Sequence, residues 1–341
     1  MTSHHHWLKK AAVGWLFLGA LLVQFAELSH AEISQPRNAD GITEVTIGVY
    51  VLDIDGIDTA NQSFTANIAL VMSWHDPRLA QTEADRVSVP LNDVWNPRVQ
   101  IVNQQKIWPT FPEIVEIDNQ GNALYRQRYW GDFSQPLDLK DFPFDSQNFK
   151  FHFVAAGNRP DGLVFIKDSM TGISDRLSVA DWTVKNITAG SEPFGFSTNP
   201  KMIAGYSVEI EASRKSGYFW VKVIIPLILI VMMSWIVFWI DPRESGSQIS
   251  VAITSMLTLI AYRFAVGADM PKLSYLTRLD LFILGGTVLV FASLLVVVVT
   301  STYAKTGKVD RAQTIDLWAR VLFPLGFILL GLKALVPGFD F

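Results

Sequence analysis

Four apolar stretches in the last third of the chain constrain its fold more than any other feature. Residues 223–240 and 281–299 contain no Asp, Glu, Lys or Arg, and each is close to the ~20 residues that a helix needs to cross a bilayer. Two other stretches are less pure, because residues 249–266 include Arg263 and residues 318–336 include Arg320 and Lys333. We therefore predict a transmembrane bundle of four helices within 215–341, with spans at about 217–240, 247–268, 274–302 and 314–336.

A shorter apolar run lies near the N-terminus. Lys9 and Lys10 precede the run 11–25, and the small residue Ala31 follows it. A basic segment, a short apolar core and a small residue before the cleavage point are typical of a secretory signal peptide. We expect residues 1–31 to be removed, and an uncleaved membrane anchor is the alternative.

The charges between the last two spans orient the chain in the membrane. Lys305, Lys308 and Arg311 lie in this connection against a single acid, Asp310. An excess of positive charge marks a cytoplasmic loop. We expect a multi-pass protein of the plasma (inner) membrane, with the domain before the first span extracellular or periplasmic.

Residues 32–214 show the pattern of a β protein. Valine and isoleucine alternate with other residues in 44–51, and the period of two returns in 64–74, 149–153 and 206–212. Strict alternation predicts strands with one buried and one wet face. Turn residues such as Asp55-Gly56 and Asn96-Pro97 separate the strands. We predict an all-β, immunoglobulin-like antiparallel sandwich over residues 32–214, followed by the membrane helices.

Composition excludes several functions. The net charge of −4 gives no electrostatic footprint for nucleic acid, and the absence of cysteine excludes disulfides and thiolate chemistry. After residue 31 the only histidines are His75 and His152. With no metal-ligand spacing, nucleophile motif or phosphate-binding glycine loop, we predict no enzyme, no metal site and no cofactor.

The second span differs from the others because hydroxyl groups recur along it. Positions 250, 254, 257, 261 and 264 fall within an arc of about 80° at 100° per residue. This face contains Ser250, Thr254, Leu257, Ala261 and Phe264. Such a stripe fits either a helix–helix contact or the wall of a water-filled pore, and the pattern alone leaves both open.

Residues 138–149 read Asp-Leu-Lys-Asp-Phe-Pro-Phe-Asp-Ser-Gln-Asn-Phe. This stretch resembles the signature loop of the pentameric ligand-gated ion channels (the Cys-loop receptor superfamily), whose core is Phe-Pro-Phe-Asp-x-Gln. Gln135 and Phe149 stand where animal members have disulfide cysteines, which resembles the prokaryotic branch. Shorter matches, in the expected order, are Trp74-x-Asp76, Trp95-x-Pro97, residues 214–226, Ser234-Trp235 and Met270-Pro271-Lys272.

The resemblance implies a homopentamer in membrane lipid, with the second helices around a central axis that conducts small ions. Ser250 and Thr254 would then replace part of an ion's hydration at the inner end, and Leu257 and Phe264 would form apolar constrictions. Anion-selective relatives typically have Pro-Ala-Arg just inside this helix, and this chain has Glu244-Ser-Gly-Ser-Gln248. Cation-selective relatives usually place a glutamate where this chain has Ser247. We expect cation selectivity with Glu244 as the candidate residue; the alternative is that Glu244 pairs with Arg243 or is simply solvated.

The resemblance also implies a coupling site between the two domains. Asp145 and Arg214 are expected to form an ion pair, and Phe142 and Pro143 to pack near Pro271 and Lys272. Asp58 is expected beside them in the turn 55–62, where the alternative is an ordinary solvated aspartate. The ion pair has its own alternative, a purely structural role.

Arg263 lies about 120° from Leu257 around the second helix, so it does not line the expected pore. A charge inside a span normally has a partner or reaches for the interface. We predict an intramembrane pair between Arg263 and Asp280.

The activating signal is the least constrained feature. The aromatic cage positions of amine-binding relatives are occupied here by Ala69, Val102 and Ala156. Phe194, Phe196 and Tyr206 are candidates for a reduced pocket for a small molecule, and packing of the hairpin is the alternative.

Proton gating is the second possibility, and its candidate groups are His152, Glu192, Glu209, Asp53, Asp55 and Asp58. A membrane-anchored β-domain sensor or adhesion receptor without conduction is the alternative function.

Overall fold

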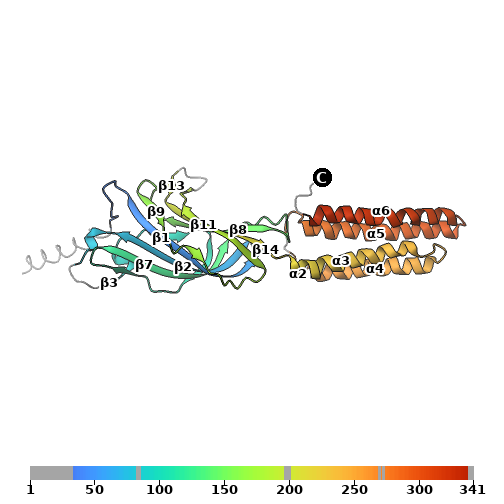
Figure 1. Cartoon of the computed structure of the whole chain (residues 1–341), viewed down its shortest axis with the longest axis horizontal. Coiled ribbons are helices and arrows are strands. Elements are labelled where there is room, and N and C mark those ends of the chain that lie inside the picture. The colour runs from blue at the N-terminus through green and yellow to red at the C-terminus, as the bar shows by residue number, and fades with distance from the viewer. Residues whose placement is uncertain (1–33, 82–85, 196–200, 268–269, 271–272, 337–341) are drawn as a thin grey trace, which may run out of the picture.

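The computed structural model describes residues 34–81, 86–195, 201–267, 270 and 273–336. Within them the chain is elongated, with a β domain at one end and long, nearly parallel helices at the other (Figure 1). This arrangement confirms the predicted fold class. The expected signal peptide, residues 1–31, lies outside the described residues.

Two sheets form most of the β domain. The first has eight strands with the main order β10-β1-β2-β7-β6-β3, while β5 pairs with β7 and β9 with β1. Its strands are β1 (Thr43–Asp58), β2 (Ser63–His75), β3 (Val87–Pro90), β5 (Gln104–Pro109), β6 (Ile114–Ile117), β7 (Asn122–Ser134), β9 (Leu163–Lys167) and β10 (Gly172–Ile173). The second has the order β11-β14-β8-β4, and a short hairpin of β12 and β13 stands apart. These strands are β4 (Val99–Ile101), β8 (Ser146–Ala155), β11 (Trp182–Ser191), β12 (Phe194–Gly195), β13 (Met202–Ile203) and β14 (Gly205–Arg214).

The core between the sheets is built from the residues that alternate in the sequence. In β2 every second side chain from Phe64 to Trp74 is buried. Phe64 and Phe133 of the first sheet meet Phe149 and Phe151 of the second, with ring centroids 4.8 to 5.3 Å apart. Each such aromatic pair contributes about 0.5–1.5 kcal/mol beyond the area that it buries.

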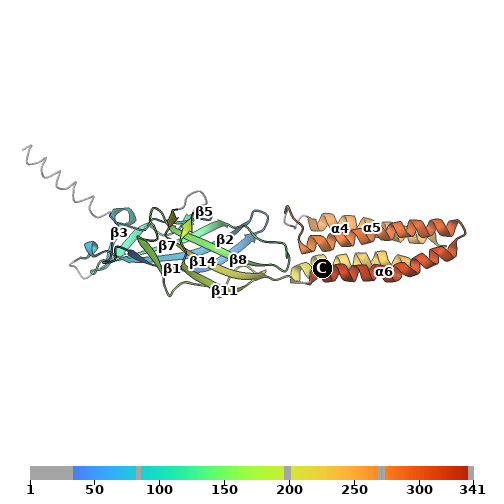
Figure 2. The same cartoon turned by 90° about the horizontal axis from the view of Figure 1, so that it is seen from above.

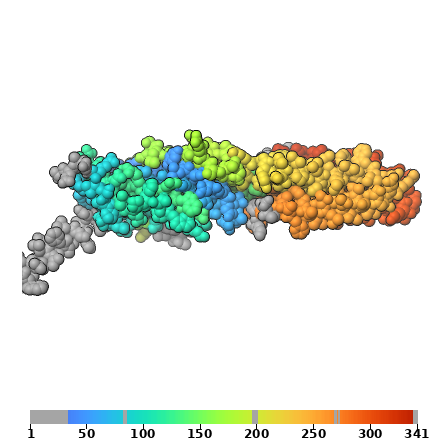
Figure 3. Space-filling view, turned by 90° about the horizontal axis from the view of Figure 1, so that it is seen from below, coloured from blue at the N-terminus to red at the C-terminus, as the bar shows by residue number. Residues whose placement is uncertain are grey.

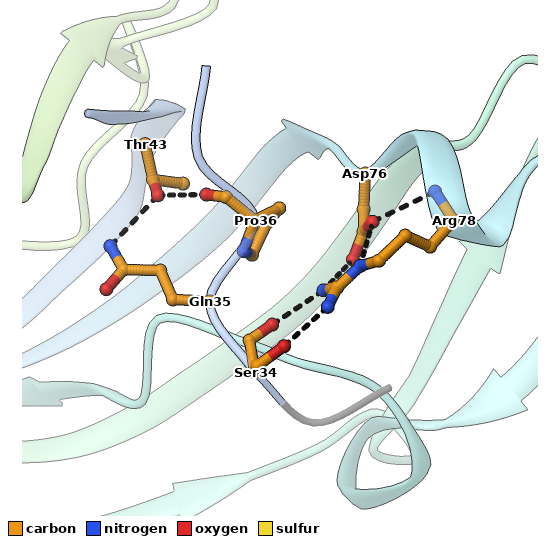
Figure 4. Close-up of polar contacts among 6 residues, drawn as sticks. All are labelled: Ser34, Gln35, Pro36, Thr43, Asp76 and Arg78. Carbon is orange, nitrogen blue, oxygen red and sulfur yellow. Dashed lines mark hydrogen bonds and ion pairs between the residues drawn. The ribbon is translucent and has the colours of Figure 1, made fainter. Parts of the chain in front are cut away.

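The first described residues are fixed to the end of the β domain away from the helices. Arg78 binds the buried carboxylate of Asp76, with Nη2 and Oδ2 2.7 Å apart, and also donates to the hydroxyl and carbonyl oxygens of Ser34 (Figure 4). Beside them Gln35 donates to the Thr43 hydroxyl, which donates to the carbonyl of Pro36. These bonds make residues 34–43 part of the domain.

Four helical segments have the length and apolarity to cross a membrane: Gly217–Trp239, Ser245–Gly267, Arg278–Lys305 and Val309–Leu335. The first is composed of α2 (Gly217–Phe219), a π-helical stretch η3 (Trp220–Ile224), α3 (Ile225–Ile236) and a 3-10 turn η4 (Val237–Trp239). The others are single helices, α4, α5 and α6 in order. Figure 2 shows them running side by side from the β domain outward. The ends of these four helices differ by up to five residues from those estimated from the sequence.

The π-helical stretch has a specific partner in the second span. A π-helical stretch changes the local hydrogen-bond ladder. The hydroxyl of Tyr262 in α4 donates to the carbonyl of Val223 at 2.8 Å. The outer part of α4 is therefore fastened to the first span.

Candidate pore helix and coupling site

The stripe predicted on the second span is open to the surface of the chain. Leu257 is 61% and Phe264 81% exposed, and Ser250, Thr254 and Ala261 are exposed as well. The side chains packed against the other helices lie on the opposite face of α4: Gln248, Ala252, Ser255 and Leu259. Figure 3 shows the yellow-to-orange surface of α3, α4 and α5 along one flank of the bundle. Within a single chain, no other described segment therefore packs on this face of α4.

The hydroxyl groups on α4 are oriented by their own helix. Thr254 Oγ1 donates to the carbonyl of Ser250 at 2.8 Å, and Thr258 Oγ1 donates to the carbonyl of Thr254 at 2.8 Å. Because each hydroxyl proton points back along the helix, the oxygen lone pairs remain for other groups. These oxygens offer acceptor sites along an exposed helix face.

Glu244 directly precedes α4 and is exposed. Its backbone N–H donates to the carbonyl of Asp241, and its carbonyl accepts from Gln248. Within the residues described, no ion pair joins its carboxylate to Arg243. A carboxylate at the start of a helix is favoured by the helix dipole.

Asp145 and Arg214 lie at the junction of the two domains and are brought together as an ion pair. Arg214 Nε is 2.7 Å from Asp145 Oδ1, and its Nη2 is 3.2 Å from Oδ2. The side chains are only 6% and 1% exposed. The guanidinium also lies over the rings of Trp182 and Phe142, at 4.3 and 4.9 Å from their centroids. Since Arg214 ends β14 and α2 begins at Gly217, the pair lies directly above the first span.

The loop of residues 138–149 also binds the start of α5. The backbone N–H of Leu279 donates to the carbonyl of Phe142, and that of Arg278 donates to Lys140. Arg278 Nε donates to Asp141 at 2.5 Å, and the Tyr275 hydroxyl accepts from the N–H of Leu139 at 3.0 Å. The expected partners Pro271 and Lys272 lie outside the described residues. The loop contacts the segment that immediately follows them.

Phe142 and Pro143 are both buried and are joined by a cis peptide bond. The Phe142 ring meets Phe219 of α2 edge-on, with centroids 4.8 Å apart. The same loop therefore contacts the beginnings of the first and third spans.

Comparisons with known proteins agree with this geometry. Residues 20–188 match the neurotransmitter-gated ion-channel ligand binding domain, and residues 223–323 match the neurotransmitter-gated ion-channel transmembrane region. The chain belongs to the neurotransmitter-gated ion-channel family. It is 24% identical over 334 residues to a protein of Gloeobacter violaceus (strain ATCC 29082 / PCC 7421) described as a proton-gated ion channel. This similarity covers 96% of the present chain and 92% of that relative.

Membership of this family makes the chain an ion channel of the prokaryotic ligand-gated type and not an enzyme. It is a multi-pass membrane protein with an extracellular β domain. The remaining residues expected at functional sites can be placed within this channel.

Asp58 of the channel is engaged within its own turn. Its carboxylate accepts from the backbone N–H groups of Ala60 and Asn61 and from the Asn61 side chain, at 2.8 to 3.0 Å. These bonds, first of all the one from the Asn61 N–H, lower the pKa of Asp58. Asp58 therefore holds the turn in shape, and its expected role in coupling stays a prediction.

The pair predicted between Arg263 and Asp280 is not formed. Asp280 Oδ2 instead accepts from the backbone N–H and the hydroxyl of Thr277, which closes a capping box at the start of α5. The physical reason is that N–H groups at the start of a helix have no partner within the helix, so a nearby carboxylate accepts hydrogen bonds there. Arg263 is exposed on α4 and has no ion pair with any described residue.

The aromatic candidates of the hairpin do not form a shared pocket among the described residues. Tyr206 is fully buried in the sandwich core, with its hydroxyl 3.4 Å from that of Thr171, so its assignment as a pocket residue is corrected. The alternation of β14 places Tyr206 on the core face. Phe196 lies outside the described residues, and Phe194 meets the ring of His152 edge-on, with centroids 4.9 Å apart.

A charged cluster of Lys150, Glu192 and Glu209 lies beside His152 of the second sheet. Lys150 Nζ is 2.8 Å from Glu192 and 2.9 Å from Glu209, and the bond from Lys150 lowers the pKa of Glu192. Burial lowers the pKa of His152 below its ordinary value of 6.5. Its Nε2 atom is buried and makes no hydrogen bond with the described residues.

Two of the other acids near the turn are hydrogen-bonded. Asp53 accepts from the Ser178 N–H at 2.6 Å and from its hydroxyl, and these bonds outweigh burial and lower the pKa of Asp53. Asp55 accepts from the indole N–H of Trp130 at 2.5 Å.

Several contacts at these sites have no signal in the sequence motifs. Tyr262, Tyr275 and Arg278 join the domains or the spans through side chains that no pattern singles out. Gln248 and Asp316 meet inside the membrane domain. Of these residues only Asp316 has a signal in the sequence, because it is a carboxylate beside an apolar stretch.

Proposed function

We propose that this chain assembles into a homopentameric cation channel that is opened by protons at its extracellular domain. The observation that carries the proposal is the uncovered face of α4, with hydroxyl groups toward the inner end and Leu257 and Phe264 further out. A single helix cannot enclose a conduit, whereas a closed ring of identical subunits covers this face with copies of itself.

The apolar part of the stripe supports a gate that needs no plug. Rings of Leu257 and of Phe264 around a narrow axis would expel water and stop ions when the helices move inward. The tie from Tyr262 to the first span would carry such movements from the outer end of α4.

Two features support cation selectivity. The Thr254 hydroxyl donates its proton to the carbonyl of Ser250, so the lone pairs of its oxygen are left for an ion in the pore. Glu244, exposed beside the inner end of α4, would add a ring of five carboxylates. Both place negative charge density along the expected ion path.

The proposed stimulus is extracellular acid. The relative from Gloeobacter violaceus is described as proton-gated. His152 is half-buried beside Lys150, Glu192 and Glu209, its pKa is lowered by burial, and its ring contacts Phe194 of the hairpin. Protonation would place a second cation beside Lys150 and turn the Phe194 contact into a cation–π contact, which favours another arrangement of the hairpin. A small-molecule agonist at the same hairpin is the second candidate.

The path from this cluster to the pore is proposed to run through the domain junction. β8 and β14 both pass from the His152 cluster to the Asp145–Arg214 pair. From there the Phe142 contacts reach the first and third spans. In this proposal residues 1–31 are a cleaved signal peptide and residues 32–214 form the sensing domain.

The test is reconstitution of the purified full chain in liposomes and planar bilayers, with conductance recorded as the extracellular pH is lowered. Acid-evoked currents with a reversal potential that follows the cation gradient are expected. Currents that follow chloride would overturn the selectivity, and an absence of conductance at every pH and with amine ligands would favour the sensor or adhesion reading. Glu244→Gln should weaken cation preference, and Asp310→Asn, an exposed acid in the first turn of α6, is the matched control.

A further inference from the structure

Two polar side chains inside the membrane domain are buried without satisfying their hydrogen-bonding capacity. Asp316 of α6 and Gln248 of α4 are both 0% exposed. Gln248 Nε2 donates to the carbonyl of Ile240 at 2.9 Å and lies 3.4 Å from Asp316 Oδ2. The remaining oxygens, Asp316 Oδ1 and Gln248 Oε1, are buried and have no partner among the described residues.

Both unsatisfied atoms are hydrogen-bond acceptors when the acid is ionised. The pair therefore lacks a donor, and an ionised carboxylate with a single long hydrogen bond is costly in an apolar environment. A proton on Asp316 removes the charge and supplies the missing donor. The carboxylic acid is then able to donate to Gln248 while still accepting from it.

The neighbouring groups do not replace that proton. Arg320, one turn further along α6, donates its Nε to the carbonyl of Phe238 at 2.9 Å and lies over the ring of Trp239. No ion pair joins Arg320 to Asp316 in the described chain. The positive charge of Arg320 offsets part of the charge of an ionised Asp316, whereas Asp241, after η4, adds negative charge. Residues 281–304 of α5 contain no charged side chain.

The position of the pair connects it with conduction. Gln248 lies in the first turn of α4, two residues before Ser250, the innermost residue of the proposed pore stripe. Asp316 lies about 10 Å from the start of α6, at 1.5 Å per residue, and so at the cytoplasmic end of the bundle. The contact joins the proposed pore helix to the last span at the inner end.

We propose that Asp316 is a proton-binding site of the membrane domain, which is protonated in the conformation described here and links cytoplasmic pH to the inner end of the pore through Gln248. Loss of the proton leaves a buried charge that Arg320 and Gln248 compensate only in part, and this charge weakens the contact between α4 and α6. This inference rests on the proposed channel function but concerns a different site and the opposite side of the membrane from the His152 cluster.

The test is a recording from excised inside-out patches, with extracellular acid held constant while the cytoplasmic pH is stepped between acid and alkaline values. In the wild-type channel the acid-evoked current is expected to change about 5-fold or more, the lower end of ordinary coupling between sites. Asp316→Asn keeps the shape of the side chain and is uncharged, as the protonated acid is. At every cytoplasmic pH its current should equal the current that the wild type gives at acid cytoplasmic pH. Asp310→Asn should respond as the wild type does.

A spectroscopic measurement gives a second, independent readout. The wild-type protein in lipid at acid pH should show an infrared carbonyl band of a protonated carboxylic acid, which is lost in Asp316→Asn and retained in Asp310→Asn. A wild-type current that is independent of cytoplasmic pH, or the absence of that band, would overturn the inference. Absence of any acid-evoked current would instead contradict the proposed function itself.

Discussion

The Asp145–Arg214 pair allows a quantitative prediction for the domain junction. Asp145→Asn keeps the shape of the side chain but leaves the Arg214 guanidinium charged at a site where it is 6% exposed. Removing one partner of a buried ion pair costs about 3–5 kcal/mol, because the remaining charge loses its compensation. The guanidinium already lies over the rings of Trp182 and Phe142 in the wild type, so these cation–π contacts, of about 0.5–2 kcal/mol each, do not offset the loss.

The matched control lies four residues earlier in the same loop. Asp141→Asn removes the carboxylate from the pair with Arg278, but the Asp141 side chain is 58% exposed. Such a pair contributes about 0–1 kcal/mol. Arg278 also keeps its bonds to the carbonyls of Lys333 and Val336.

The assay is thermal unfolding of the full channel in detergent, followed by the loss of the assembled peak in size-exclusion chromatography. For a unit of this size 1 kcal/mol shifts Tm by roughly 2–4 °C, so Asp145→Asn should lower Tm by roughly 6–20 °C and Asp141→Asn by less than about 4 °C. Equal shifts in Tm for the two variants would refute the argument that burial sets how much the Asp145–Arg214 pair contributes to stability. Exchange of the two charges should not restore Tm, because the aromatic rings favour the cation at position 214.

Three other predictions address the pore, the pH response and the backbone. Leu257→Ser should raise conductance at a given pH by ~10-fold or more, since each buried leucine contributes about 1.5–3 kcal/mol to a closed apolar ring; unchanged bilayer currents would place Leu257 away from the axis. Because burial lowers the pKa of His152, the resting arrangement is fully stable above pH 6.5 and loses stability as pH falls through the folded-state pKa. His152→Gln should therefore flatten the acid response, and His75→Gln, at an exposed site, should not. Gly131→Ala should abolish assembly, because its φ of +152° and the nearby Lys106 carbonyl leave no room for a Cβ, whereas Gly56→Ala, with open space, should assemble normally.

Much of the fold was predictable from the sequence because its strongest signals are physical requirements. Spans must be apolar for about 20 residues, and a half-buried strand must alternate, as β2 does from Phe64 to Trp74. The α4 stripe follows from the same reasoning, since its angular spacing does not depend on how the other helices pack. The ends of the spans were less accurate because capping by Thr277 and Asp280 depends on local hydrogen bonds.

Pairings between distant side chains were harder to predict. Arg263 and Asp280 have opposite charges at a similar depth, but depth does not show that Asp280 is already engaged by a helix terminus. The aromatic ring of Tyr206 and its place near the hairpin suggest a pocket, but its position in the alternation of β14 puts it in the core. The contact of Gln248 with Asp316 joins residues 68 positions apart and has no local pattern at all.

The hydrogen bond from Tyr262 to the carbonyl of Val223 has a mechanical consequence. It fixes the outer end of one helix to a backbone atom of its neighbour, while the lower half of α4 is held at Gln248 by Ile240 and Asp316. A helix that is held near both ends by its neighbours bends or rotates with them more readily than it slides along its own axis. Rearrangements of this channel should therefore preserve the height of α4 against the first span, and a cross-link between positions 223 and 262 should leave conduction intact.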